Sequence, residues 1–162
     1  MIAGLLLTLV FLAAIADWVA VSKGWTKIEY IAKPATLLLL FAWLFVRSRL
    51  QGVLLWFGLG ALFSLVGDVF LLFSDRWFVP GLVAFLLAHV MYIAGFNLPL
   101  PNISPVWAAL LAFILGLSAV RLLRRIAAGL AAKGQRRLIG PVLLYGAIIT
   151  LMLLSAFLTL FR

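Results

Sequence analysis

The sequence predicts an all-α integral membrane protein, a single transmembrane helical bundle of about six spans over residues 1–162. Composition is the first reason, because 67% of the residues are hydrophobic and 10% are charged, whereas a soluble domain is about 45–50% apolar and 25% charged. The apolar residues also gather in long runs, and the joints between these runs are short and polar or turn-like.

Each apolar run has close to the roughly 20 residues that a helix needs to cross about 30 Å of hydrocarbon. The runs extend over Ile2–Ser22, Ile28–Val46, Gly52–Phe73, Phe78–Phe96, Ser104–Leu123 and Leu138–Phe161. The first run has an alternative interpretation as a secretory signal, because Ala14-Ile15-Ala16 resembles a cleavage site. No Lys or Arg precedes this run and the run is long, so a membrane span is favoured.

The second span contains a proline whose position decides where the helix begins. A helix from Pro34 to Val46 would rise only about 20 Å, too short to cross the membrane. The helix is therefore expected to begin near Ile28, which places Lys33 inside it and a kink at Pro34.

The third and fourth spans each carry a patterned face. Gly60, Ser64, Gly67, Asp68 and Leu71 recur at three- and four-residue spacing, and small residues mark the face where membrane helices approach one another. Asp68 is therefore expected to point into the bundle. In the fourth span, one stripe joins an aromatic wall to a single histidine: Phe85, His89, Tyr92 and Phe96. This stripe suits a long-chain ligand with a reactive head.

The fifth and sixth spans flank a long basic joint, Arg121–Arg137, which contributes most of the basic residues on one side of the membrane. Joints one, three and five carry Lys23, Lys27, Arg76, Arg121, Arg124, Arg125, Lys133, Arg136 and Arg137, and the opposite side carries Arg47, Arg49 and Arg162. The odd joints are therefore expected in the cytoplasm and the N-terminus outside, with a bacterial cytoplasmic membrane as the location. The net charge of +9 is read as this orientation signal, with anionic lipid as the alternative partner, and not as a nucleic-acid surface.

Four ionisable residues lie inside the apolar runs. Counted along serpentine helices from one membrane face, Asp17 and Lys33 lie about 7 Å deep, Asp68 about 9 Å and His89 about 16 Å. All four therefore fall in the same half of the bilayer, with Asp75 at the rim above them. A charge at mid-bilayer costs about 3 kcal/mol by the lowest estimates, so these residues are the candidates for function.

Structural alternatives stay open for these residues. Lys33 pairs in the favourable order with Glu29 one turn earlier, and its side chain can extend to the interface. Asp17 lies one turn from an interface, which is a mild position. Asp68 and His89 have an alternative role as a hydrogen-bonded pair that ties two helices together.

Several chemistries lack their residues. The chain has no cysteine and one histidine, which excludes a disulfide or thiol nucleophile and does not support zinc. It also has no Gly-x-Ser-x-Gly elbow and no P-loop. What remains is acid–base chemistry by carboxylate and histidine, or proton-coupled transport.

Motifs in four of the predicted spans resemble the YhhN-like lysoplasmalogenase family. They are Lys33-Pro34, the Gly-Asp-Val-Phe-Leu-Leu segment 67–72, the Gly-Leu-Val-Ala-Phe-Leu-Leu-Ala-His-Val-Met-Tyr-Ile segment 81–93, and more weakly Tyr145, Met152 and Ala156. The resemblance implies a multi-span hydrolase that cleaves the vinyl ether bond of lysoplasmalogens to a fatty aldehyde and a glycerophospho-alcohol. Members usually continue for about two more spans with a second Ser-Asp motif, so this chain, which stops at Arg162, is expected to be a fragment or a short variant.

The chemistry of vinyl ether hydrolysis suggests roles for the residues present. Proton delivery to the β-carbon requires a protonated carboxyl group, a form that burial favours. Asp68 is expected to be this acid or the carboxylate that faces the resulting cation, by analogy with the carboxylate pairs of glycosidases. His89 would orient Asp68 or relay protons, and Lys33 would hold the lipid phosphate.

The remaining site residues are Tyr92 and Phe85, which would line the alkenyl chain, and Asp75, which would contact the headgroup side. The partners are then a lysophospholipid substrate and membrane lipids, with no metal or organic cofactor and no nucleic acid. The rival functions are a small proton-coupled transporter or lipid-binding protein, with Asp68 and His89 as a relay, and a scaffold without chemistry.

Overall fold

The computed structural model is all-α and describes residues 2–73, 75–100 and 104–161, without the side chains of Asp75 and Phe161. The long helices are α1 (Ile2–Lys23), α2 (Thr26–Ser48), α3 (Leu54–Leu72), α4 (Phe78–Asn97), α5 (Pro105–Ala132) and α6 (Ile139–Leu158), with short 3-10 turns η1 (Asp75–Trp77), η2 (Arg136–Leu138) and η3 (Thr159–Phe161). Within the described ranges, 6 helical segments are long and apolar enough to cross a membrane. The predicted fold class, a polytopic helical membrane protein, is confirmed.

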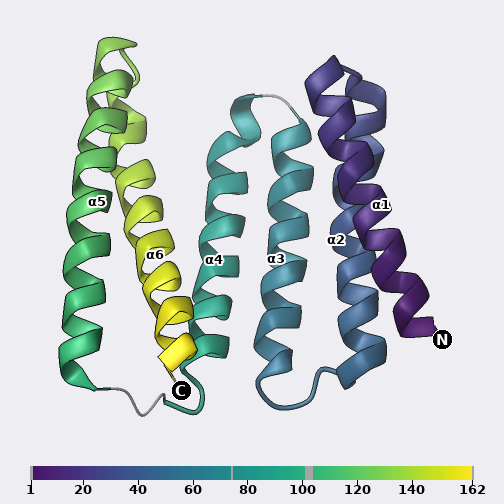
Figure 1. Cartoon of the computed structure of the whole chain (residues 1–162). Helices are drawn as coiled ribbons and strands as arrows, with labels where there is room; N and C mark the ends of the chain where they lie inside the picture. The colour runs from purple at the N-terminus through teal and green to yellow at the C-terminus, as the bar shows by residue number, and fades with distance from the viewer. Residues whose placement is uncertain (1, 74, 101–103, 162) are drawn as a thin grey trace. The chain divides into compact units, whose positions relative to one another are not determined.

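The chain divides into two compact units, Met1–Met91 and Tyr92–Arg162, and the boundary falls inside α4. In the first unit, α1 packs against α2 and α2 against α3; in the second, α5 and α6 form an antiparallel hairpin (Figure 1). The prediction of one domain over residues 1–162 stays a prediction.

Helix α2 begins at Thr26, close to the expected start at Ile28, and Pro34 lies inside it. Lys33 is therefore within the span, as the length argument predicts. Pro34 has no N–H to donate to the carbonyl of Tyr30, so one bond is missing from the helical ladder at this point. The kink expected at Pro34 stays a prediction.

Helix packing in the first unit depends on small side chains. The buried alanines are Ala20, Ala32, Ala61, Ala84 and Ala88, whereas large apolar side chains are exposed and form a surface suited to lipid. Between α3 and α4, a Cβ added at Gly67 would lie 2.7 Å from the ring of Phe85, and one added at Gly81 would lie 3.0 Å from Leu71. Gly67 and Leu71, two residues of the small-residue face predicted for α3, thus meet α4.

Helix α5 is longer than predicted. Its expected end was Leu123, but the helix continues to Ala132, so the prediction of a joint beginning at Arg121 is wrong. The residues after Leu123 are mainly Arg, Ala, Leu and Ile, and several of these are strong helix formers. The chain turns at Gly134, whose φ of 72° is left-handed. At 1.5 Å per residue, α5 is about 42 Å long, which exceeds the hydrocarbon thickness and leaves its basic end at or beyond the interface.

Candidate functional site

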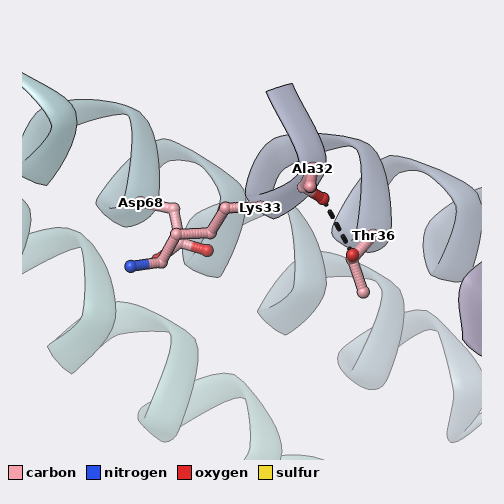
Figure 2. Close-up of polar contacts among 4 residues, drawn as sticks. All are labelled: Ala32, Lys33, Thr36 and Asp68. Atoms are coloured by element: carbon pink, nitrogen blue, oxygen red, sulfur yellow. Dashed lines mark hydrogen bonds and ion pairs between the residues drawn. The ribbon is translucent and has the colours of Figure 1, made fainter. Parts of the chain in front are cut away.

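The centre of the candidate site is an ion pair between two neighbouring helices. The side chains of Lys33 from α2 and Asp68 from α3 lie in the same region between the helices (Figure 2), and Lys33 Nζ lies 4.0 Å from Asp68 Oδ1. Their side chains are 33% and 13% exposed, so the carboxylate is the more deeply buried partner. A separation of 4.0 Å is an ion pair but too long for a hydrogen bond, so the ammonium does not donate a hydrogen bond to this carboxylate oxygen.

A second contact joins α2 and α3 about one turn nearer to the start of α2 and the end of α3. The hydroxyl of Tyr30 donates a hydrogen bond of 2.6 Å to the carbonyl of Leu72, the last residue of α3. The last carbonyls of a helix have no partner within the helix, so this bond satisfies one of them. The start of α2 thus lies beside the end of α3, so Lys33 and Asp68 lie at the same end of these two helices. Their position in one half of the bilayer stays a prediction.

Sequence reasoning did not identify Tyr30. The signal available was its position three residues before Lys33, where a tyrosine shares the lysine's helix face and lies nearer the interface. Thr36, one turn after Ala32, has no such role, because its hydroxyl donates to the carbonyl of Ala32 at 2.8 Å (Figure 2).

Asp17 of α1 also belongs to this region. It is seven residues after Val10 and three before Ala20, the buried residues of α1, and this spacing places all three on the face of α1 that packs against the bundle. Oδ1 of Asp17 is buried and has no hydrogen-bond partner among the described residues. Asp17 is close enough to Asp68 for the two carboxyl groups to interact electrostatically.

His89 is anchored to its own helix. Its Nδ1 lies 2.5 Å from the carbonyl oxygen of Phe85. A carbonyl only accepts, so Nδ1 donates the hydrogen of this bond. The ring of Phe85 in turn lies over Gly67, the residue before Asp68. A direct contact between His89 and Asp68 stays a prediction.

The contact between α3 and α4 separates a polar side from an apolar side. A groove of about 410 Å³ is lined by Phe63, Val66, Phe70, Val79, Pro80, Val83, Ala84 and Leu87. At 100° per residue, Asp68 projects from α3 away from Val66 and Phe70, and His89 projects from α4 away from Val83. The groove is therefore on the opposite side of these helices from the ionisable residues, and the cavity expected around Lys33, Asp68 and His89 stays a prediction.

Two further predicted site residues are placed only in part. Tyr92 lies on α4 in the second unit, and its part in the site stays a prediction. The backbone of Asp75 begins η1, three residues after the end of α3. Its side chain, expected at the rim of the site, lies outside the described side chains.

Comparison with known proteins identifies the family. The family model for YhhN matches residues 28–162. The chain belongs to the YhhN family. The match within this YhhN protein covers the ion pair of Lys33 and Asp68 as well as His89, but it leaves out α1 and Asp17. No curated protein and no solved structure shows significant similarity to the chain.

Proposed function

We propose that this YhhN protein is a membrane-embedded hydrolase that cleaves the vinyl ether bond of lysoplasmalogens to a fatty aldehyde and a glycerophospho-alcohol. The YhhN family includes lysoplasmalogenases. The observation that carries the proposal is the Lys33–Asp68 ion pair, because charged side chains within membrane spans are costly and mark functional sites.

The reaction begins at the alkene. Asp68 in its acid form delivers a proton to the β-carbon of the vinyl ether, and the α-carbon becomes part of an oxocarbenium ion. Water attacks this carbon and loses a proton to His89, giving a hemiacetal. Collapse of the hemiacetal moves the hydroxyl proton to the ether oxygen, breaks the C–O bond and releases aldehyde and alcohol. One water is consumed, and proton transfer from His89 restores the acid.

The proposed orientation of the substrate follows from the depths predicted for the site residues, with the lipid phosphate near the membrane surface and the apolar chain deeper. Lys33 is the cation of the site and its ammonium is not engaged in a hydrogen bond with Asp68, so it binds the lipid phosphate. Phe85, which packs on Gly67 beside Asp68, lines the apolar chain deeper in the membrane. This arrangement places the ether bond between the phosphate and the chain, next to the proposed acid.

The test uses purified protein in lipid nanodiscs with a lysoplasmalogen as substrate. Fatty aldehyde should be released, whereas the saturated alkyl ether of the same headgroup should not react because it has no alkene to protonate. Absence of aldehyde from protein that is verified as folded overturns the proposal. Proton flux driven by a pH gradient in proteoliposomes, without aldehyde release, would instead support the transporter.

A further inference from the structure

We propose that Asp17 of α1 is the second carboxyl group of the site and acts together with Asp68 in the same reaction. This inference rests on the proposed hydrolase function and adds a residue to it. It assigns a role to a helix that lies outside the matched family region of residues 28–162, so it stands on the geometry of this chain.

The position of Asp17 is the first support. It shares the packed face of α1 with Val10 and Ala20, which are 8% and 0% exposed. The neighbouring Trp18 is 80% exposed, so the helix directs the aspartate inward and the tryptophan outward. Helix α1 packs against α2, the helix that carries Lys33, and Lys33 pairs with Asp68.

The lack of a structural partner is the second support. An aspartate retained to hold helices together would use its oxygens in hydrogen bonds, because a buried polar atom without a partner costs about 1–3 kcal/mol. Oδ1 of Asp17 is buried and has no hydrogen-bond partner among the described residues. Asp17 therefore weakens the fold at this oxygen, which is typical of groups that serve a ligand or a reaction.

Charge balance gives the pair its chemistry. The site has two carboxyl groups, Asp17 and Asp68, and one ammonium, Lys33, in apolar surroundings where an unpaired charge is costly. In the proposed reaction, one carboxyl group acts as the acid and the other as the carboxylate.

Vinyl ether hydrolysis uses both forms. The carboxylic acid gives its proton to the β-carbon, and the carboxylate stabilises the oxocarbenium ion that results, as in glycosidases with two carboxylates. Water then adds to the α-carbon, and its released proton returns to the pair through His89. The proton count of the site is the same before and after one turnover.

The test compares Asp17→Asn, Asp68→Asn and the double variant in the aldehyde-release assay, with thermal unfolding of each protein in detergent. Asp17→Asn should lower kcat by about 10²- to 10³-fold, leave KM within about threefold, and leave the unfolding midpoint unchanged or raised, because an amide is cheaper than a carboxylate to bury. The double variant should be no more than about threefold slower than Asp68→Asn alone, because groups that act as a unit are not additive.

Thr8→Val is the matched control on the same helix. Thr8 is nine residues before Asp17, on the opposite side of α1, and its hydroxyl bonds to the carbonyl of Gly4 within the helix. This variant should stay within about twofold of wild type.

Three results overturn the inference: Asp17→Asn within threefold of wild-type kcat, a rise in KM alone, or a lowered unfolding midpoint with losses that add to those of Asp68→Asn. Failure of the inference and failure of the proposed function are distinct, because wild-type protein still releases aldehyde in the first case and does not in the second.

Discussion

The two units of the chain place their polar groups differently. In the first unit, hydroxyls such as that of Thr36 bond within their own helix, and two polar contacts also cross between helices, from Tyr30 to Leu72 and from Lys33 to Asp68. In the second unit, the hydroxyls of Thr150 and Ser155 bond to carbonyls of their own helix. The arginines of the second unit lie at the basic end of α5 and beyond. A hydroxyl can form a hydrogen bond within its own helix in any fold, whereas a polar contact between helices requires a specific tertiary arrangement. The first unit is therefore where chemistry is expected.

The strongest test of this comparison is removal of the central carboxyl group. Asp68→Asn keeps the size of the side chain but removes the transferable proton, so aldehyde release should fall by about 10²- to 10⁴-fold. The measurement is kcat in nanodiscs, with membrane insertion checked by protease protection. Activity within about tenfold of wild type would remove Asp68 from the role of acid.

The close contact of α3 and α4 offers a test of packing. Gly67→Ala places a Cβ 2.7 Å from the ring of Phe85, and the overpacking should destabilise the fold by about 1–3 kcal/mol. Gly4→Ala is the control, because a Cβ there meets nothing within 4 Å. Thermal unfolding in one detergent should rank Gly67→Ala below both wild type and Gly4→Ala, and equal midpoints would contradict the close contact.

The ammonium group of the ion pair is expected to act mainly in binding. Lys33→Met removes the cation proposed to hold the phosphate, so KM for lysoplasmalogen should rise by about tenfold or more, the value of a charged hydrogen bond. Lys33→Arg retains a cation and should recover most of the affinity. If Lys33→Met leaves KM unchanged, the phosphate is bound elsewhere.

The basic end of α5 should show the smallest effect. Arg124 is exposed on the second unit, so Arg124→Gln should leave aldehyde release within about twofold of wild type, as for surface substitutions in general. A loss as large as that of Lys33→Met would show that the second unit contributes to the chemistry, and the contrast between the units would fail.

The helices themselves could be predicted with few errors, because a membrane span requires a long apolar run and such runs are visible in the sequence. The position of Pro34 inside α2 was predicted correctly, because a helix that began at Pro34 would be too short to cross the membrane. The predicted end of α5 was wrong because arginine interrupts an apolar run but does not interrupt a helix. Arg121, Arg124 and Arg125 favour helix and lie where the helix leaves the hydrocarbon. Hydrophobicity thus predicts where the membrane ends, which differs from where the helix ends.

The sequence by itself determined the class of protein and its candidate spans. It also predicted the depth of Asp17, Lys33 and Asp68, because depth follows from residue count along a helix of fixed rise. Only the tertiary structure decided which side chains meet. Three features depend on the rotation of each helix about its axis: the ion pair of Lys33 with Asp68, the bond of Tyr30 to Leu72, and the Asp17 oxygen that has no partner among the described residues. That rotation is fixed by close packing of small residues such as Gly67 against a neighbouring helix, a contact between segments distant in the sequence.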